Sequence, residues 1–178
     1  MRLVHFLDSH PLRGAFVANA LERLAGLIVE QGEDLLRDAG LTFPSRAAST
    51  VLLLGERTRL SAADLAKTLG QPHQLVTQRV DLLIELGIVS RADDSGDARR
   101  RILVLTSKGK RQFERLKPRL AHAEAAFAGL SAEIGCDLSG AALSAIAALG
   151  RASVLDRVRA LEKMDGRSEK SSAGAKSA

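Results

Sequence analysis

The chain has 178 residues, 46% of them apolar, which fits one globular domain or a small domain with additional helices and argues against two full domains. Only 3% are aromatic, all of them Phe, so we expect a core of aliphatic side chains on helices and not an all-β sandwich. The formal net charge of +5 is compatible with an anionic partner, and the single cysteine, Cys136, excludes an intramolecular disulfide and a multi-cysteine zinc cluster.

The distribution of apolar residues favours a cytoplasmic protein. The N-terminal stretch VHFL is too short for the core of a signal peptide, and Asp8 follows it closely. No later apolar run reaches the length that a bilayer-spanning helix requires. A lone cysteine also fits a reducing compartment. We therefore expect a cytoplasmic location and no membrane partner.

The first quarter of the chain predicts two helices. Residues 12–39 form the first, because their apolar side chains recur every three to four residues. Gly40 is a plausible end, and Pro44 suits the first turn of a second helix that runs to about residue 54. The apolar positions of the first helix are Leu12, Phe16, Leu21, Leu24, Ile28 and Leu35.

Residues 61–86 predict two short helices around a tight turn. Ser61 can cap the first helix, and Asp64, three places later, completes a variant of the capping box. Gly70 ends this helix. The second helix begins at or near Pro72, a residue that suits a first helical position, and ends at Gly87.

The second of these helices has an apolar face and a polar face. Val76, Val80 and Leu83 follow an i, i+4, i+7 spacing and predict the buried face. A Gln amide can both donate to and accept from adenine, so the opposite face suits contacts with base edges; a merely solvated polar face is the alternative. His73, at the start of the helix, can contact DNA or cap its own turn. The residues of the polar face are Gln74, Thr77, Gln78 and Asp81.

A β-hairpin is predicted after Gly87. Two short apolar runs, at 88–89 and 102–105, flank a stretch rich in Asp, Ser and Gly. Three arginines at 99–101 lie where they can neutralise phosphates or enter a narrow minor groove, and Asp97 can orient Arg99. From 99 to 119 there are nine Lys or Arg residues and one acid, which concentrates positive charge here. A solubilising charged turn is the alternative interpretation.

The last third predicts two more helices and a tail. One begins at Thr106 or Ser107 and runs to about residue 127, with Pro118 expected to kink or restart it. Another spans residues 139–164 and carries an apolar stripe that needs a cover, either from its own chain or from the first helix and a second copy. Residues 166–178 are small and polar, a composition typical of a disordered tail.

In this order and spacing, residues 12–164 resemble the multiple-antibiotic-resistance-regulator (MarR) family of winged helix-turn-helix transcription factors. Ala66, Gly70 and Val76 match its helix-turn-helix, Asp97 and Arg99 match its Asp-x-Arg in the wing, and LTSKG matches its Leu-Thr-x-x-Gly. The segments that carry the resemblance are LSAADLAKTLG, QPHQLVTQRVDLLIELG, IVSR and DARRRILVLTSKG.

The resemblance implies a homodimer with an interface formed by the first and last helices. Its two winged domains would bind an inverted repeat of double-stranded DNA, with half-sites ~34–36 Å apart. Many members are repressors released by a small aromatic ligand. Some relatives sense oxidants through a cysteine near the N-terminus; this chain has none there, so oxidant sensing is not expected.

The fold class expected is mainly α with a small β-hairpin wing: a winged helix-turn-helix flanked by N- and C-terminal dimerisation helices. The N-terminal dimerisation helix occupies residues 1–43, the DNA-binding domain 44–109, the C-terminal dimerisation helices 110–165 and the tail 166–178. The candidate DNA-binding residues are Gln71, Pro72, His73, Gln74, Thr77, Gln78, Arg79, Asp97, Arg99, Arg100 and Arg101.

Two other classes of function compete with this hypothesis. An enzyme has little support, since the four histidines are scattered without metal-ligand spacing and no Gly-rich phosphate loop is present; we expect no cofactor and no metal. The stronger rival is a winged-helix module for protein assembly, because the fold alone does not determine the partner. RNA is disfavoured, since the narrow major groove of A-form RNA does not admit a helix.

Overall fold

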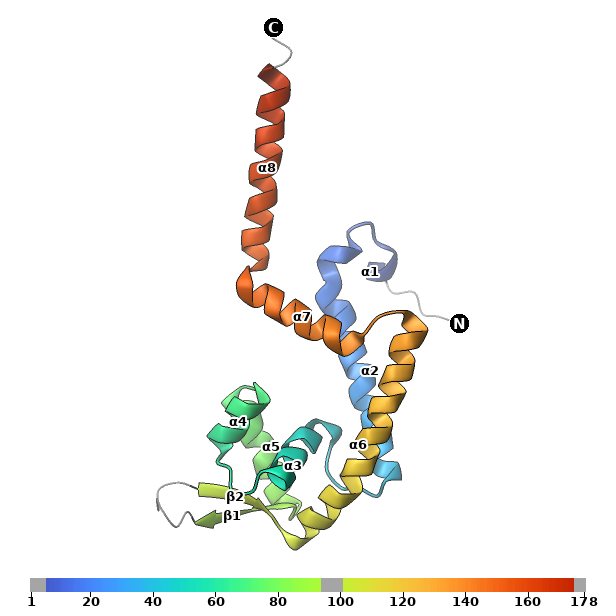
Figure 1. Cartoon of the computed structure of the whole chain (residues 1–178), viewed down its shortest axis with the longest axis vertical. Coiled ribbons are helices and arrows are strands. Elements are labelled where there is room, and N and C mark those ends of the chain that lie inside the picture. Colours follow the sequence, from blue (N-terminus) through green and yellow to red (C-terminus); the bar gives the residue numbers. More distant parts are fainter. Residues whose placement is uncertain (1–5, 94–100, 175–178) are drawn as a thin grey trace. The chain divides into compact units, whose positions relative to one another are not determined.

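A computed structural model describes residues 6–93 and 101–174 and divides the chain into two compact units, residues 1–123 and 124–178 (Figure 1). The fold is mainly helical with one two-stranded sheet, which confirms the expected class. The finer division into dimerisation and DNA-binding segments stays a prediction. Unit 1 contains α1 (Phe6–Ser9), η1 (Arg13–Phe16), α2 (Val17–Asp38), η2 (Ser45–Ala47), α3 (Ala48–Glu56), α4 (Ala62–Leu69), α5 (His73–Glu85), β1 (Val89–Asp93), β2 (Arg101–Leu105) and the first part of α6 (Ser107–Ile134).

The first long helix begins later than its apolar spacing predicts. Instead of a continuous helix from residue 12, the chain forms α1 and η1 before α2 starts at Val17. Pro11 and Gly14 weaken helix formation here, and the imidazole Nδ1 of His10 accepts a hydrogen bond from the amide of Leu12. The end agrees with the prediction, since Gly40 adopts a left-handed φ of 66° just past the helix. The second helix is preceded by η2, whose N-cap is Pro44.

The core of unit 1 packs α3, α4, α5 and the start of α6 against the sheet. The predicted face of α5 is confirmed: Val76, Val80 and Leu83 are all buried. Gly55 on α3 permits close contact with the ring of Phe113 on α6, because a Cβ at position 55 would stand 2.3 Å from that ring. The burial of Val76, Val80 and Leu83 leaves the opposite face of α5 exposed.

Local signals determine the helix-turn-helix much as the sequence predicts. The hydroxyl of Ser61 accepts from the amide of Asp64, and the Asp64 carboxylate accepts from the amide of Ser61, which completes the capping box. Gly70 ends α4 with a φ of 61°. Pro72 is the N-cap of α5 and not its first residue, one position from the prediction.

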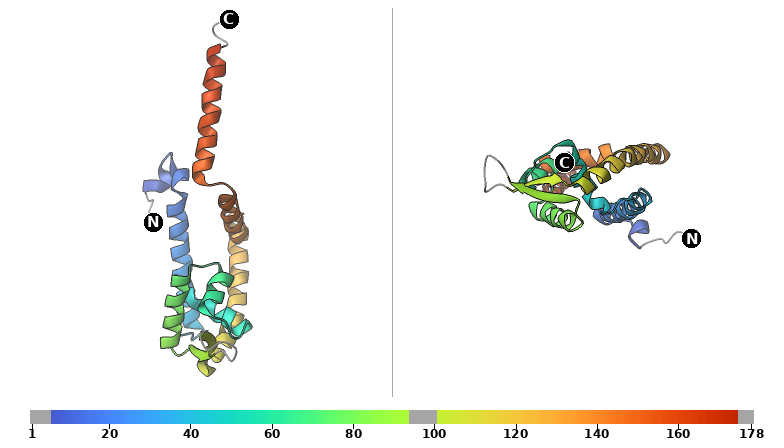
Figure 2. Two further views of the ribbon diagram at one scale, coloured as in Figure 1. Left: turned by 90° about the vertical axis from the view of Figure 1, so that its left-hand side faces the viewer. Right: turned by 90° about the horizontal axis from the view of Figure 1, so that it is seen from below.

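The predicted hairpin is confirmed, and a residue before α4 also pairs with its second strand. β1 and β2 lie side by side as an antiparallel pair (Figure 2). Val89 lies opposite Leu105, and Asp93 lies opposite Arg101. The amide of Leu103 also donates to the carbonyl of Leu60 over 2.8 Å, an isolated bridge just before α4. This bridge ties the helix-turn-helix to the wing. A single paired residue leaves no periodic pattern in the sequence, so it was not predicted.

Pro118 does not restart α6, contrary to one of the two expected outcomes. The helix continues from Ser107 through Pro118 to Ile134, beyond the predicted end near residue 127. Pro removes one backbone hydrogen bond and costs roughly 3 kcal/mol inside a helix, but long helical segments on both sides and the buried Leu116 offset this cost. Gly135, with a φ of 67°, follows the real end.

Unit 2 contains the end of α6, α7 (Leu138–Arg151) and α8 (Val154–Gly174). The single helix predicted for 139–164 is therefore wrong, because Ser153 and Asp156 form a capping box that begins a new helix. α8 also includes residues 166–174, part of the expected tail. Residues 175–178 lie outside the described part of the chain.

Within residues 6–93 and 101–174, no single helix is long and apolar enough to cross a membrane. The adjoining helices α6 and α7, bent at the break between them, reach that length and apolar composition only when taken together.

Candidate nucleic-acid interface

The N-terminal half of α5 presents an exposed stripe of amide side chains. Gln74 and Gln78, one turn apart, are exposed and lie opposite the buried face of the helix. The outermost stripe continues with Asp81 and Glu85, also exposed, so amides occupy its first half and carboxylates its second. Helices that enter the major groove contact base edges with their N-terminal residues. The neutral, hydrogen-bonding half of α5 is therefore the half suited to that contact.

Thr77 and His73 form a small polar group at the start of α5. The Thr77 hydroxyl donates to the carbonyl oxygen of His73 over 2.9 Å and lies 3.4 Å from its Nδ1. Thr77 is half-buried and His73 is exposed. Because its proton is used within the helix, the Thr77 hydroxyl is left as a hydrogen-bond acceptor for an external donor. The exposed His73 ring is accessible to solvent at the start of the helix.

Gln71 and Arg79 interact with each other across the first two turns of α5. The guanidinium of Arg79 donates to the side-chain oxygen of Gln71, and both residues are half-buried. Burial lowers the pKa of Arg79, and the nearby charge of Arg46 lowers it further. The shift leaves Arg79 charged at neutral pH, since an arginine does not lose its proton in proteins. Two positive groups, Arg46 on η2 and Arg79 on α5, thus lie near each other.

An ion pair that sequence reasoning missed connects α5 to the hairpin. Nη2 of Arg91 on β1 donates to Oδ1 of Asp81 over 2.7 Å. No sequence signal could locate this pair, because it depends on how the helix packs against the strand.

The structure describes only part of the predicted wing site. Arg101 opens β2 and is exposed, and it lies opposite Asp93 in the strand register. Asp97, Arg99 and Arg100 lie outside the described residues. The candidate residues 71–74 and 77–79, in contrast, are brought together on α5 and the turn before it. The DNA-binding role of all these residues stays a prediction.

Several Lys and Arg side chains of the basic segment after the hairpin make contacts within unit 1. Lys108 Nζ donates to the carbonyl oxygen of Leu86 over 2.8 Å, at the C-terminal end of α5. Lys117 lies over the ring of Phe113 at 5.4 Å. Arg119 pairs with Asp38 at the end of α2, over 2.9 Å. The charge count from 99 to 119 therefore overstates the positive charge available to an anionic partner.

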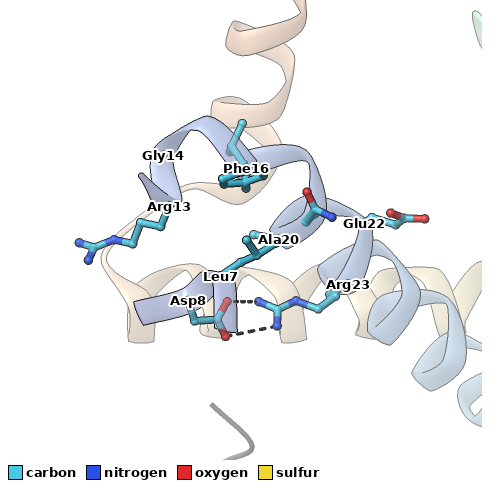
Figure 3. A pocket seen from close by; sticks show the side chains of 10 residues that line it. Leu7, Asp8, Arg13, Gly14, Phe16, Ala20, Glu22 and Arg23 are labelled. Carbon is cyan, nitrogen blue, oxygen red and sulfur yellow. Dashed lines mark hydrogen bonds and ion pairs between the residues drawn. The ribbon is translucent and has the colours of Figure 1, made fainter. Parts of the chain in front are cut away.

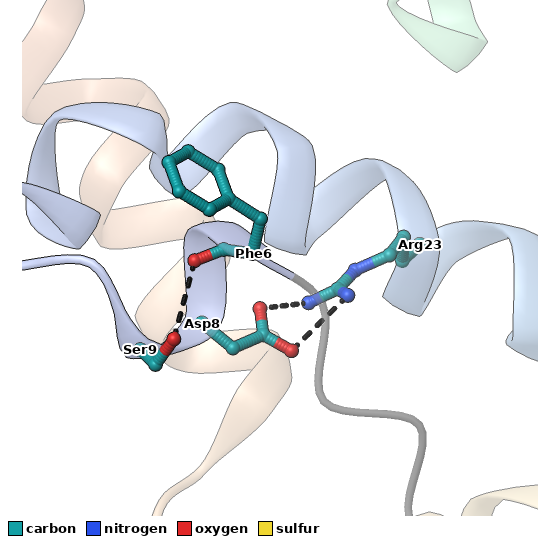
Figure 4. Close-up of polar contacts among 4 residues, drawn as sticks. All are labelled: Phe6, Asp8, Ser9 and Arg23. Carbon is teal, nitrogen blue, oxygen red and sulfur yellow. Dashed lines mark hydrogen bonds and ion pairs between the residues drawn. The ribbon is translucent and has the colours of Figure 1, made fainter.

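A separate hollow of about 600 Å³ lies among α1, η1 and α2 (Figure 3). Leu7, Phe16 and Ala20 line it with apolar groups. A bidentate contact between Arg23 and Asp8, at 2.6 and 3.2 Å, closes one side, and the Ser9 hydroxyl donates to the carbonyl of Phe6 beside it (Figure 4). Of the four charged residues that line the hollow, Asp8, Arg13, Glu22 and Arg23, the ion pair joins Asp8 to Arg23.

Groups for metal or redox chemistry are also separated in the part of the chain that the structure describes. There, no cluster of three or more His, Cys, Asp or Glu side chains is placed to hold a metal ion. Cys136 is an exposed free thiol between α6 and α7.

Comparison with known proteins identifies the architecture. The segment from residue 39 to 100 matches the model of the MarR family. No curated protein matches the chain. S. aureus MepR, solved in a complex with DNA, is similar with a TM-score of 0.62 and 17% identity, covering 74% of this chain and 96% of MepR.

Two further solved structures have comparable similarity. CouR of Rhodococcus jostii RHA1, a transcriptional repressor bound to a 23-mer DNA duplex, has a TM-score of 0.56 and 26% identity, over 74% of this chain and 89% of CouR. PcaV of Streptomyces coelicolor, in complex with its natural ligand, has a TM-score of 0.56 and 22% identity, over 86% of this chain and 99% of PcaV. The matching family model and these shared architectures together show that the helix-turn-helix with its hairpin is a winged-helix domain of the MarR type.

Proposed function

We propose that this protein is a sequence-specific transcriptional repressor that binds an inverted-repeat operator as a homodimer. The observation that carries the proposal is the exposed amide stripe of Gln74 and Gln78 on the N-terminal half of α5, opposite a fully packed face. Each amide can form a bidentate contact with adenine in the major groove. MepR and CouR, which share the fold, were each solved with DNA, which supports duplex DNA as the partner.

Exposed apolar side chains support a dimer. Contiguous apolar surface on a soluble protein usually marks an interface. In unit 1 such residues lie on η1, α2 and the segment before them, and in unit 2 they lie on α7 and α8. They are Leu12, Phe16, Val17, Leu21, Leu27 and Ile28 in unit 1, and Leu143, Ile146, Leu149, Val154, Leu155, Val158 and Leu161 in unit 2. A second copy would cover both sets, as the expected interface of first and last helices requires.

Release by a small aromatic ligand is the remaining part of the proposal. Its support is that PcaV, with the same fold, was solved with a natural ligand. A ligand that binds the free protein more tightly than the DNA-bound protein would shift the equilibrium away from DNA. In this chain, the ligand's effect would be a loss of operator affinity that grows with ligand concentration.

The test is a selection of random duplexes with the purified protein, followed by titration of the winning sequence by fluorescence anisotropy at several salt concentrations. We expect an enriched inverted repeat with half-site centres one helical turn apart, and a linear fall of log affinity with log salt, about 0.9 for each phosphate neutralised. Light scattering of the free protein should give the mass of a dimer. Sequence-blind binding without enrichment would contradict the proposal and favour a protein-assembly module.

A further inference from the structure

The ion pair between Asp81 and Arg91 lies at the junction of α5 and the hairpin. Asp81 Oδ1 and Arg91 Nη2 are 2.7 Å apart, and the two side chains are 55% and 46% exposed. The pair is thus open to solvent and to a ligand that approaches α5 from its exposed face. A guanidinium bound to a carboxylate in this way has a strong, charge-assisted hydrogen bond.

The position of Asp81 is unfavourable for a helix that approaches DNA. It lies three residues after Gln78 and seven after Gln74, on the same exposed stripe. A free carboxylate there would repel the phosphates beside the groove. The pair cancels that charge, but it also withdraws the Arg91 guanidinium from phosphate binding.

This withdrawal affects sequence-independent binding most. Affinity for DNA of any sequence comes almost entirely from neutralising phosphates with Lys and Arg. In a complex held by base contacts, those contacts would keep α5 in one pose with Arg91 beside position 81. In a complex without base contacts the protein can shift, so a free Arg91 can reach a phosphate.

We propose that Asp81 is a specificity-determining residue that acts through Arg91: by binding the guanidinium, it keeps Arg91 from neutralising phosphates of unselected sequences. The inference rests on the proposed DNA-binding function. It adds a role for two residues outside the predicted set of DNA-binding residues. Discrimination between operator and other DNA is a ratio of affinities, and Asp81 raises this ratio by weakening the competing complex.

The experiment compares wild type, Asp81→Asn and the double variant Asp81→Asn/Arg91→Gln on the selected operator and on a scrambled duplex. Anisotropy titrations run from about 50 to 200 mM salt, the range in which phosphate contacts dominate the change in affinity. For Asp81→Asn we expect roughly tenfold tighter binding to the scrambled duplex and a salt slope steeper by about 0.9 per protomer, with a smaller change on the operator. The double variant should lose this gain.

The matched control is Asp34→Asn. Asp34 also pairs with an arginine, Arg37, at 2.5 Å on an exposed surface, but it lies on α2 and not on α5 or the hairpin. Exposed ion pairs contribute little to stability, so both single variants should unfold at nearly the wild-type denaturant concentration. An equal gain in the control would show a general charge effect and overturn the inference.

Two further outcomes separate this inference from the proposed function. If wild type prefers its operator but Asp81→Asn binds scrambled DNA with wild-type affinity and slope, the inference is wrong and the proposed function stands. If wild type enriches no sequence, the proposed function fails, and the inference fails with it.

Discussion

Gly109, in the first turn of α6, lies directly against the carbonyl oxygen of Ile88: a Cβ at position 109 would stand 2.0 Å from that oxygen. Thr106 completes the junction. Its hydroxyl donates to the carbonyl of Gly87 over 2.7 Å and accepts from the amide of Gly109 over 3.0 Å. The end of α5, the return strand of the hairpin and the start of α6 are therefore joined through backbone groups.

We expect Gly109→Ala to destabilise the protein by about 1–3 kcal/mol or more, because the new methyl group forces two backbone segments apart. Urea unfolding followed by far-UV circular dichroism measures the change. The control is Gly129→Ala in the same helix, where a Cβ meets nothing within 4 Å. That substitution should be neutral or stabilising by about 0.4–1 kcal/mol. Equal effects at the two positions would contradict the close approach at Ile88.

The capping box of α8 should be visible in an acid titration. The hydrogen bond from the Ser153 hydroxyl, and then that from the Ser153 amide, lower the pKa of Asp156 below its ordinary 3.8, while desolvation slightly opposes the shift. Because the pKa of Asp156 is lower in the folded protein, the ionised carboxylate stabilises α8 fully above pH 3.8. This stabilisation is lost as the pH falls through the lowered pKa.

The measurement is the side-chain carboxyl ¹³C shift of Asp156 against pH. Wild type should have a midpoint below 3.8, and Ser153→Ala should move it back toward 3.8. Ser153→Thr, which retains the hydroxyl, should keep the low midpoint. A midpoint unaffected by Ser153→Ala would disprove the capping box as the cause.

Gln78→Ala should lower discrimination between DNA sites more than it lowers total affinity. A lost bidentate amide contact costs about 1–3 kcal/mol at the base pair that it recognises and leaves phosphate contacts intact. We expect the salt slope to stay at the wild-type value, while the preferred base at one half-site position is relaxed. Glu85→Ala, on the same exposed stripe but in its acidic half, should not relax that base.

Arg99→Ala should weaken binding to every sequence. If Arg99 neutralises a phosphate from the wing, its loss reduces the salt slope by about 0.9 per protomer and affects operator and scrambled duplexes alike. Arg37→Ala removes an equal charge from α2 and serves as the control. An unchanged slope for Arg99→Ala at all salt concentrations would reject its assignment to the DNA contact.

Local signals determined much of the DNA-facing part of the fold. The Ser61 capping box and the left-handed glycines at 70 and 87 set the ends of α4 and α5, since each acts within one turn of the chain. The same logic was available at Ser153, where an identical Ser-x-x-Asp pattern starts α8. It was missed because the apolar period of the two helices continues across the break.

The sequence by itself thus determined the helix-turn-helix, the buried face of α5, the hairpin and the resemblance to the MarR family. Tertiary structure decided the bridge from Leu60 to Leu103, the passage of α6 through Pro118 and the pairing of Asp81 with Arg91. The physical reason is the distance along the chain over which each interaction acts. Caps and periodic faces depend on neighbours within a turn, whereas these three features depend on how a helix packs against a strand or a core, and packing depends on the whole of unit 1 at once.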